Sequence, residues 1–365
     1  MQLIPCILIT CLLYANTSDA RQKDSLLARE KCIAALAFME SGDPAQSVPL
    51  LQEAIRLDPG NEMYVYEMAA ARYALQEYDK AITVLQPLTR QKPASPLVYV
   101  LLGHCYDDSG KRSKARETYD RALQLFPEAG NLYTERGMLE MQAKEYERAL
   151  IYFETGILAS PMHAANYYWA SKLFCNSSEK VWGMIYGEVF LNLEKRNPSR
   201  IREISKLLYL TYKSDVHFPG DTAVTVDFSR GHDIAGVLWS DAPGELTPSF
   251  RTPYSTGIYQ PFLLEALQGE KIISLPSLHR ARTRFLSMYE LREKQQEATP
   301  LFDYQLKVRA AGFLEAYNYW ILGFGDERDF EVWRLSNPAL FRNFLTWQQE
   351  HPLVVTDTSR VFRRR

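Results

Sequence analysis

The densest grouping of side chains that can bind a metal or transfer protons lies in residues 215–260. Imidazole and carboxylate groups serve as metal ligands and as general acids or bases. The histidines and neighbouring aspartates of this segment are Asp215, His217, Asp221, Asp227, His232 and Asp233. Their spacing matches no established ligand motif, and aspartate near glycine is also ordinary loop composition. Two interpretations are therefore open: a metal-dependent or catalytic module with His217, Asp221, His232 and Asp233 as ligands, or an irregular segment around a short strand at 223–228.

A second grouping, His104 with Asp107 and Asp108, falls within one predicted helix. Residues three and four apart share a helix face, so these side chains form either a ligand cluster or a solvated surface. The sequence contains no glycine-rich phosphate loop ending in Lys-Ser or Lys-Thr, no nucleophile elbow and no His-Glu-x-x-His motif. We therefore expect a protein that is not an enzyme and that needs no cofactor.

The helix that carries His104, Asp107 and Asp108 belongs to a pattern with a 34-residue period, which is the length of a helix-turn-helix repeat. Prolines recur at this interval: Pro59, Pro93, Pro127 and Pro161. Small residues stand 12 and 24 positions before them, at Ser47, Ala81, Ala115, Ala149, Ala35, Ala69, Gly103 and Gly137. Antiparallel helices approach closely only where side chains are short, because a larger residue would overpack the contact by about 1–3 kcal/mol. Large residues eight positions before each proline, Leu51, Leu85, Tyr119 and Phe153, are expected to fill the space between units.

This pattern resembles the tetratricopeptide repeat family, whose unit has the same length and the same order of small, aromatic and proline positions. The resemblance covers residues 28–61, 62–95, 96–129 and 130–163. A degenerate unit at 164–198 has Gly187 in place of the large residue, so it is either a fifth repeat or a helix pair that caps the stack. Residues 199–214 have helical spacing of apolar side chains and would extend this cap.

In this family, the first helix of each unit lines a concave groove that holds extended peptides. The resemblance places these residues in the groove: Arg29, Cys32, Met39, Tyr66, Tyr73, His104, Asp107, Asp108, Thr134, Met138, Met141, Tyr168 and Lys172. Tyrosine and methionine suit adaptable binding surfaces, although Tyr66, Tyr73 and Met141 could instead pack between helices. The set of Lys, Arg and Asn side chains with which some family members clamp a carboxylate is missing here.

The composition of the 365-residue chain, with 46% hydrophobic and 24% charged residues, is typical of a soluble protein of two domains. A net charge of −2 gives no reason to expect nucleic acid as a partner. Residues 3–15 form an apolar run that is too short to span a bilayer and has the length of a secretory signal. We expect a signal peptide at 1–20 and no transmembrane span in the mature chain; a lipoprotein signal with Cys11 lipidated, or an uncleaved anchor, is the alternative.

Three cysteines follow this predicted signal, namely Cys32, Cys105 and Cys175. An odd number on units that are not neighbours indicates buried thiols without disulfides. Beyond residue 260 the pattern predicts a compact helical domain over 261–365, with helices at 278–296, 302–322, 326–335 and 338–349 around an aromatic core. The predicted fold is thus all-α: a repeat solenoid over 21–198, the cap, the irregular segment at 215–260, and this domain.

From these features we expect a secreted or periplasmic protein of the bacterial cell envelope that acts as a protein-protein interaction scaffold. Its partner would be a protein or peptide segment held in the groove. Two alternatives stay open. In one, residues 215–260 form an enzyme or metal-binding module and the repeats recruit its substrate. In the other, the C-terminal half lengthens the solenoid into one continuous binding surface.

Overall fold

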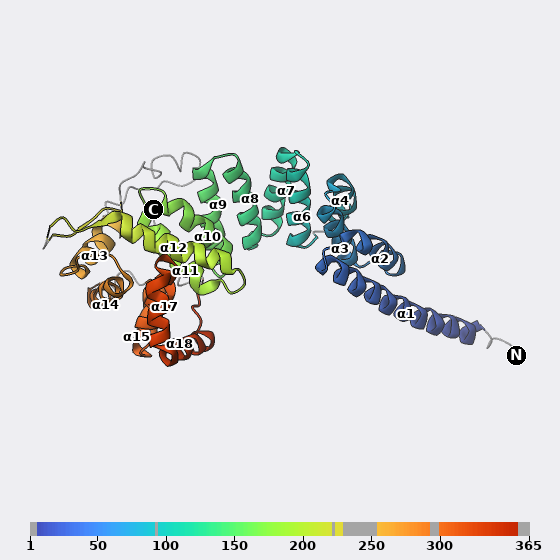
Figure 1. Ribbon diagram of the computed structural model, residues 1–365. Coiled ribbons are helices and arrows are strands. Elements are labelled where there is room, and N and C mark those ends of the chain that lie inside the picture. Colours follow the sequence, from blue (N-terminus) through green and yellow to red (C-terminus); the bar gives the residue numbers. More distant parts are fainter. Residues whose placement is uncertain (1–5, 92–93, 221–222, 229–253, 293–298, 357–365) are drawn as a thin grey trace. The chain divides into compact units, whose positions relative to one another are not determined.

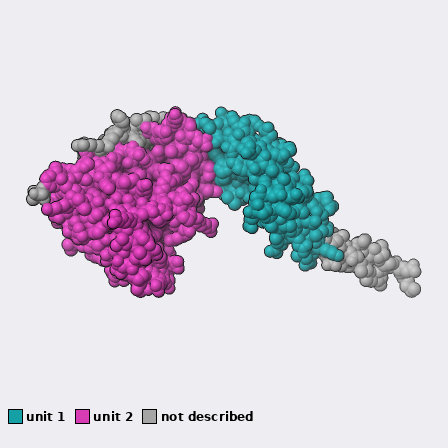
Figure 2. Space-filling view, in the orientation of Figure 1, with its two compact units in different colours: residues 1–127 teal, residues 128–365 magenta. Residues whose placement is uncertain are grey.

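The protein is described by a computed structural model that covers residues 6–91, 94–220, 223–228, 254–292 and 299–356 (Figure 1). Helices make up nearly all of the regular structure in these residues, which confirms the predicted all-α class. The chain divides into two compact units, residues 1–127 and 128–365 (Figure 2). We call these unit 1 and unit 2 and describe each by itself.

Unit 1 consists of helical hairpins in sequence order, as the 34-residue period predicts. Its helices are α1 (Cys6–Glu40), α2 (Pro44–Leu57), α3 (Glu62–Ala74), α4 (Tyr78–Leu85), α5 (Leu88–Gln91), α6 (Pro96–Asp108) and α7 (Arg112–Leu125). Helix α1 packs against α2, α3 against α4, and α6 against α7. The small residues of the register are fully buried at these contacts. At Gly103 an added Cβ would lie 2.2 Å from the ring of Tyr119, so this aromatic side chain fills the space that glycine leaves.

The turns inside the hairpins share one backbone conformation at the period of the repeat. Gly42 and Gly110 have φ values of +81° and +77°. Gln76 and Lys144, at the equivalent positions of the second and fourth repeats, have φ values of +59° and +62°. Only glycine adopts this left-handed region without steric cost, so the glutamine and the lysine hold a strained conformation that the hairpin geometry imposes.

Unit 2 begins with two further hairpins and continues into a helical domain. Its elements are α8 (Gly130–Gln142), α9 (Tyr146–Ala159), α10 (Ala164–Cys175), α11 (Lys180–Leu193), α12 (Pro198–Asp215), β1 (Val216–His217), β2 (Thr225–Val226), the π-helix η1 (Ser255–Tyr259), α13 (Gln260–Ala266), α14 (Leu275–Arg292), α15 (Pro300–Ala310), α16 (Leu314–Leu322), the 3-10 helix η2 (Gly323–Gly325), α17 (Glu327–Ser336) and α18 (Pro338–Glu350). One continuous hydrophobic core runs from Ala149 to Val355.

Helix α11 is the centre of unit 2, because every residue from 181 to 192 is buried. It contacts α10, α12, η1 and α15. The degenerate features of the fifth repeat follow from this position. An added Cβ at Gly187 would lie 2.6 Å from Ser171 Oγ and 2.8 Å from Leu208 Cδ2, so this glycine lets α12 approach where a regular repeat has a large residue.

The structure departs from three sequence predictions. The boundary between compact units falls after Pro127, within the predicted solenoid and not near residue 198, because the last two hairpins share the core of the C-terminal helices. The predicted helix at 302–322 is interrupted between α15 and α16, where Gly312 has a φ of +81°. The predicted strand at 223–228 is reduced to the short β2, which pairs antiparallel with β1.

The prediction of buried cysteines without disulfides is confirmed in the described residues. Cys32, Cys105 and Cys175 are free and buried. Burial raises the pKa of the Cys105 and Cys175 thiols to about 12, since a thiolate is poorly solvated in an apolar interior. These thiols are therefore inert packing groups at neutral pH.

Candidate functional site

The candidate surface in unit 1 is formed by one side of α3 and α6 on which the side chains are exposed or half-buried. Residues 34 positions apart stand at equivalent places on these two helices, so Met63 matches Leu97 and Tyr66 matches Val100. We call this surface the α3–α6 face and define it by Met63, Tyr66, Glu67, Ala70, Tyr73, Leu97, Val100, His104, Asp107 and Asp108. Met63 and Leu97 are 51% and 54% exposed, so the face presents a large apolar side chain at the same position of two successive repeats.

The polar end of this face lies at the C-termini of the two helices. The Tyr73 hydroxyl donates a hydrogen bond to Asp108 Oδ2 at 2.5 Å, and its ring centroid lies 6.2 Å from that of His104. Burial, followed by the bonded carboxylate, raises the pKa of Tyr73 well above its usual range. Arg112 Nε donates to Asp107 Oδ1 at 3.0 Å. The two aspartates therefore have separate partners and do not form the joint ligand cluster that their spacing allowed.

Glu67 is a member of this face that the sequence analysis missed. Its side chain is half-buried beside Tyr66. Loss of hydration raises the pKa of the Glu67 carboxyl. The equivalent residue of the next repeat is the buried Leu101, so a carboxylate at a position where the neighbouring repeat has leucine was the available signal.

The groove residues predicted on α1 differ in exposure. Arg29 is exposed, and Cys32 is buried in the core of the first hairpin. Met39 is half-buried against the same core, and its sulfur lies 3.4 Å from Ser47 Oγ. Of these three residues, only Arg29 is exposed to solvent.

The groove residues predicted in unit 2 are engaged by neighbouring helices of the same unit. Thr134 is buried, and its hydroxyl donates to Asn166 Oδ1 at 2.8 Å. Met138 and Met141 pack against the core of unit 2. The Tyr168 hydroxyl donates to Glu203 Oε2 at 2.5 Å, and Lys172 Nζ lies 2.6 Å from Glu203 Oε1. These contacts give all five predicted residues a structural role in unit 2.

The histidine and aspartate grouping at 215–260 is only partly within the described residues. His217 is exposed on β1. The Asp215 carboxylate pairs with Lys180 at 2.5 Å and accepts a hydrogen bond from Ser214 at 2.7 Å. Asp221, His232 and Asp233 lie outside the described residues. No group of three or more His, Cys, Asp or Glu side chains that could hold a metal occurs in the part of the chain that the structure describes.

A buried polar network in unit 2 also escaped the sequence analysis. Arg282 of α14 donates to both oxygens of Glu188 on α11, at 2.9 and 2.6 Å, and to Asn318 Oδ1 at 2.6 Å. Gln305 and Tyr317 donate to Glu188 Oε1 at 2.6 and 2.8 Å. No periodic pattern signals these contacts, because their partners are about a hundred residues apart. The network lies inside the core and joins α11 to α14, α15 and α16.

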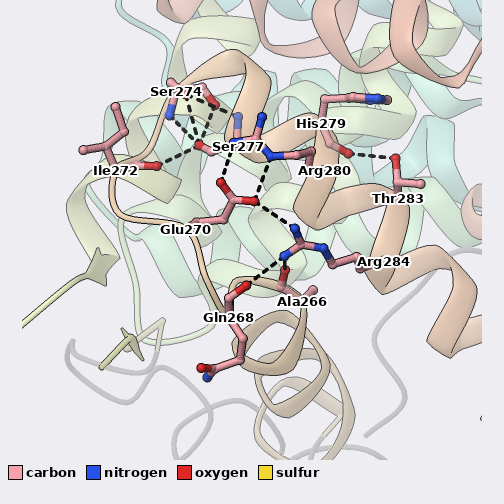
Figure 3. A network of polar contacts seen from close by, with 10 residues as sticks. All are labelled: Ala266, Gln268, Glu270, Ile272, Ser274, Ser277, His279, Arg280, Thr283 and Arg284. Carbon is pink, nitrogen blue, oxygen red and sulfur yellow. Dashed lines mark hydrogen bonds and ion pairs between the residues drawn. The ribbon is translucent and has the colours of Figure 1, made fainter. Parts of the chain in front are cut away.

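Two arginines and a glutamate form a further network at the loop between α13 and α14 (Figure 3). The buried Glu270 carboxylate accepts hydrogen bonds from Arg280 at 2.9 and 2.5 Å and from Arg284 at 3.1 Å. Hydrogen bonding to Arg280 lowers the pKa of Glu270. Arg284 also donates to the backbone carbonyls of Ala266 and Gln268 at 2.8 and 2.9 Å (Figure 3). These bonds hold the loop in place, so the network is structural.

Helices of membrane-spanning length and hydrophobicity are missing from the described residues.

Family models described as "Tetratricopeptide repeat" match residues 38–105 and 100–161. The chain is 32% identical over 84 residues to anaphase-promoting complex subunit 3 of Dictyostelium discoideum, and 28% identical over 124 residues to that subunit of Schizosaccharomyces pombe. These matches cover 23% and 34% of this chain but only 9% and 18% of the relatives.

A further relative is the Hsp70-Hsp90 organizing protein of Triticum aestivum, at 26% identity over 104 residues, which are 28% of this chain and 16% of that protein. Among solved structures, a thermophilic TPR protein of Thermus thermophilus aligns with a TM-score of 0.41 and 13% identity over 50% of this chain and 98% of that chain. Pseudomonas aeruginosa pilF aligns with a TM-score of 0.41 and 19% identity, over 53% of this chain and 85% of that chain. The repeat register, the helical hairpins and the two family models together identify residues 38–161 of this chain as tetratricopeptide repeats.

Proposed function

We propose that this protein is an interaction scaffold that holds an extended segment of a partner protein on the α3–α6 face. The observation that carries the proposal is the exposure of Met63 and Leu97, which occupy equivalent positions of successive repeats. A pair of apolar side chains at the spacing of the repeat suits a ligand that crosses both helices. The relatives support this function, since one is named as a subunit of a complex and another as an organizing protein.

The test compares three full-length proteins expressed in the native host: wild type, a Met63→Ser, Leu97→Ser double variant, and a Val332→Ser, Leu335→Ser control. The control pair lies on α17 and is 61% and 67% exposed, so it matches the apolar area removed. Partners are identified by chemical cross-linking and mass spectrometry. Burial of one such side chain contributes about 1.5–3 kcal/mol to binding. The affinity of the double variant for the partner should therefore fall by more than about tenfold.

A partner that is recovered with wild type and the α17 control, is lost with the α3–α6 variant, and cross-links within residues 62–108 supports the proposal. Equal recovery with all three proteins contradicts it. Thermal unfolding of each variant shows whether the substitutions left the fold intact.

We also propose that the protein works in the bacterial cell envelope. The apolar run at 3–15, followed by small and polar residues up to Ala20, supports export. Fractionation of the native host, with N-terminal sequencing of the mature protein, tests this location. Cleavage after Ala20 and an envelope fraction are expected; a cytoplasmic protein that begins at Met1 contradicts the proposal.

A further inference from the structure

We infer that the partner segment is cationic: its apolar side chains cover Met63 and Leu97, and its Lys or Arg side chains pair with Glu67 and Asp108. This inference rests on the proposed function and adds the chemical class of the ligand. The charges on the α3–α6 face and the pairing of the cations of unit 1 support it.

The carboxylates of this face far outnumber its basic side chains. Glu67, Asp107 and Asp108 lie on it, and no lysine or arginine does. Of the two arginines next to it, Arg72 pairs with a carboxylate outside the face and Arg112 pairs with Asp107 of the face itself. Arg72 lies 2.8 Å from Glu77, and Arg112 lies 3.0 Å from Asp107.

The lysines of the neighbouring turns are engaged as well. Lys80 Nζ lies 2.6 Å from Glu77, and Lys111 is paired with Asp79. Arg29 on α1 is exposed and pairs with neither Glu67 nor Asp108. Within the described residues, neither Glu67 nor Asp108 forms an ion pair with a lysine or arginine, so both carboxylates are available to a positively charged ligand.

Each of these two carboxylates has a reason to gain from such a ligand. Glu67 is half-buried beside the ring of Tyr66, where its charge has lost part of its hydration. A ligand cation would restore the interactions that this carboxylate lost on folding. Asp108 is oriented by the hydrogen bond from Tyr73 and still has acceptor capacity for a charged donor.

The two carboxylates stand at different places along the helices. Glu67 lies in the first half of α3 with Met63 and Tyr66, and Leu97 and Val100 lie in the first half of α6, whereas Tyr73 and Asp108 lie at the C-terminal ends. The small, half-buried Ala70 stands between Glu67 and Tyr73 on α3. An extended segment advances about 3.3 Å per residue, so a few residues are enough to connect an apolar anchor with a basic side chain.

The experiment measures binding of three short, capped, fluorescent peptides to the full-length protein by anisotropy. The peptides share their apolar residues and differ at two positions, which carry lysine, glutamine or glutamate. We expect the lysine peptide to bind about tenfold more tightly than the glutamine peptide, and the glutamate peptide to bind most weakly. Raising the salt concentration toward 1 M should remove this preference, because the Debye length falls to about 3 Å.

Glu67→Gln and Asp108→Asn should each lower the affinity for the lysine peptide about three- to fivefold and leave the affinity for the glutamine peptide unchanged. Glu117→Gln is the matched control, since this carboxylate is exposed on α7, outside the face. Equal affinity for all three peptides, with loss of binding in the Met63→Ser, Leu97→Ser variant, overturns the charge preference and leaves the proposed function standing. Tightest binding of the glutamate peptide also overturns it. Failure of every peptide to bind wild type overturns both.

Discussion

At the scale of single residues, Glu67 combines a cost to stability with the binding role that we propose for it. Desolvation raises the pKa of this carboxyl in the folded state above its value in the unfolded chain. A raised pKa means that folding disfavours the ionised form. The stability contribution of Glu67 is therefore complete below the unfolded pKa of about 4.3 and is lost as the pH rises through the folded pKa.

Glu67→Gln should consequently raise the urea midpoint of unfolding at pH 7, because the amide carries no charge to desolvate. The difference from wild type should shrink as the pH falls toward 4. Glu117→Gln, at an exposed position of α7, serves as the control and should change the midpoint little. A Glu67→Gln protein that is less stable than wild type at pH 7 would show that the carboxylate makes a favourable contact instead.

Arg282 is the residue on which the buried network of unit 2 depends. Its side chain and that of Glu188 are 9% and 6% exposed. Removing one partner of such a pair leaves an uncompensated charge in the core, so Arg282→Met should destabilise unit 2 by about 3–5 kcal/mol. Chemical unfolding followed by tryptophan fluorescence measures this loss.

The double variant Arg282→Met, Glu188→Met provides the matching comparison. It removes both charges and should recover much of the stability lost in the single variant. If the double variant is as unstable as Arg282→Met, the network contributes through its shape and its other hydrogen bonds and not through its charge balance.

At the scale of the elements, the hairpin turns of the first four repeats require a left-handed residue at a fixed place, which is strained only where that residue is Gln76 or Lys144. Gln76→Gly should stabilise unit 1 by about 0.5–1 kcal/mol, because glycine adopts its φ of +59° without steric cost. Gly110→Ala, at the equivalent turn with a φ of +77°, should destabilise it by about 1 kcal/mol. Differential scanning calorimetry of both variants measures the two changes in stability. Shifts of the same sign would contradict the view that backbone conformation controls these positions.

The elements also show why part of the structure was predictable from the sequence. Helix hairpins were predictable because Gly103, Ala115 and Tyr119 repeat their types at a local period, and local contacts leave a periodic trace. The break at Gly312 was missed because the aromatic spacing continues across it. Glu67 was missed because the groove residues were carried over from the family pattern, and position 67 was not among them.

At the scale of the whole molecule, long-range contacts decide where the repeats end. The sequence predicted a helix pair at 164–198 but not that α11 would be enclosed by α12 and α15. Pairs such as Glu188 with Arg282 are far apart in the chain and leave no spacing that a single sequence can reveal. The domain over 261–365 was therefore predicted as a separate body, whereas it shares one core with the last two hairpins.

This shared core predicts how fragments behave. A fragment of residues 128–356 should fold, because it contains the whole core from Ala149 to Val355. A fragment of residues 128–198 should not, because it would expose the buried face of α11. Near-UV circular dichroism and limited proteolysis of both fragments test this. A cooperative, protease-resistant 128–198 fragment would contradict it.

The enclosure of α11 also limits how this protein can change in length during evolution. A tetratricopeptide array grows or shrinks by gain or loss of whole units, and each new unit needs a neighbour with a free, repeat-shaped side. In unit 2 that side is taken at the fifth helix pair, where Gly187 admits α12 in place of a further hairpin. Duplications of 34 residues are thus compatible with the first four repeats, whereas any unit added after α11 would have to displace the helices that already cover it.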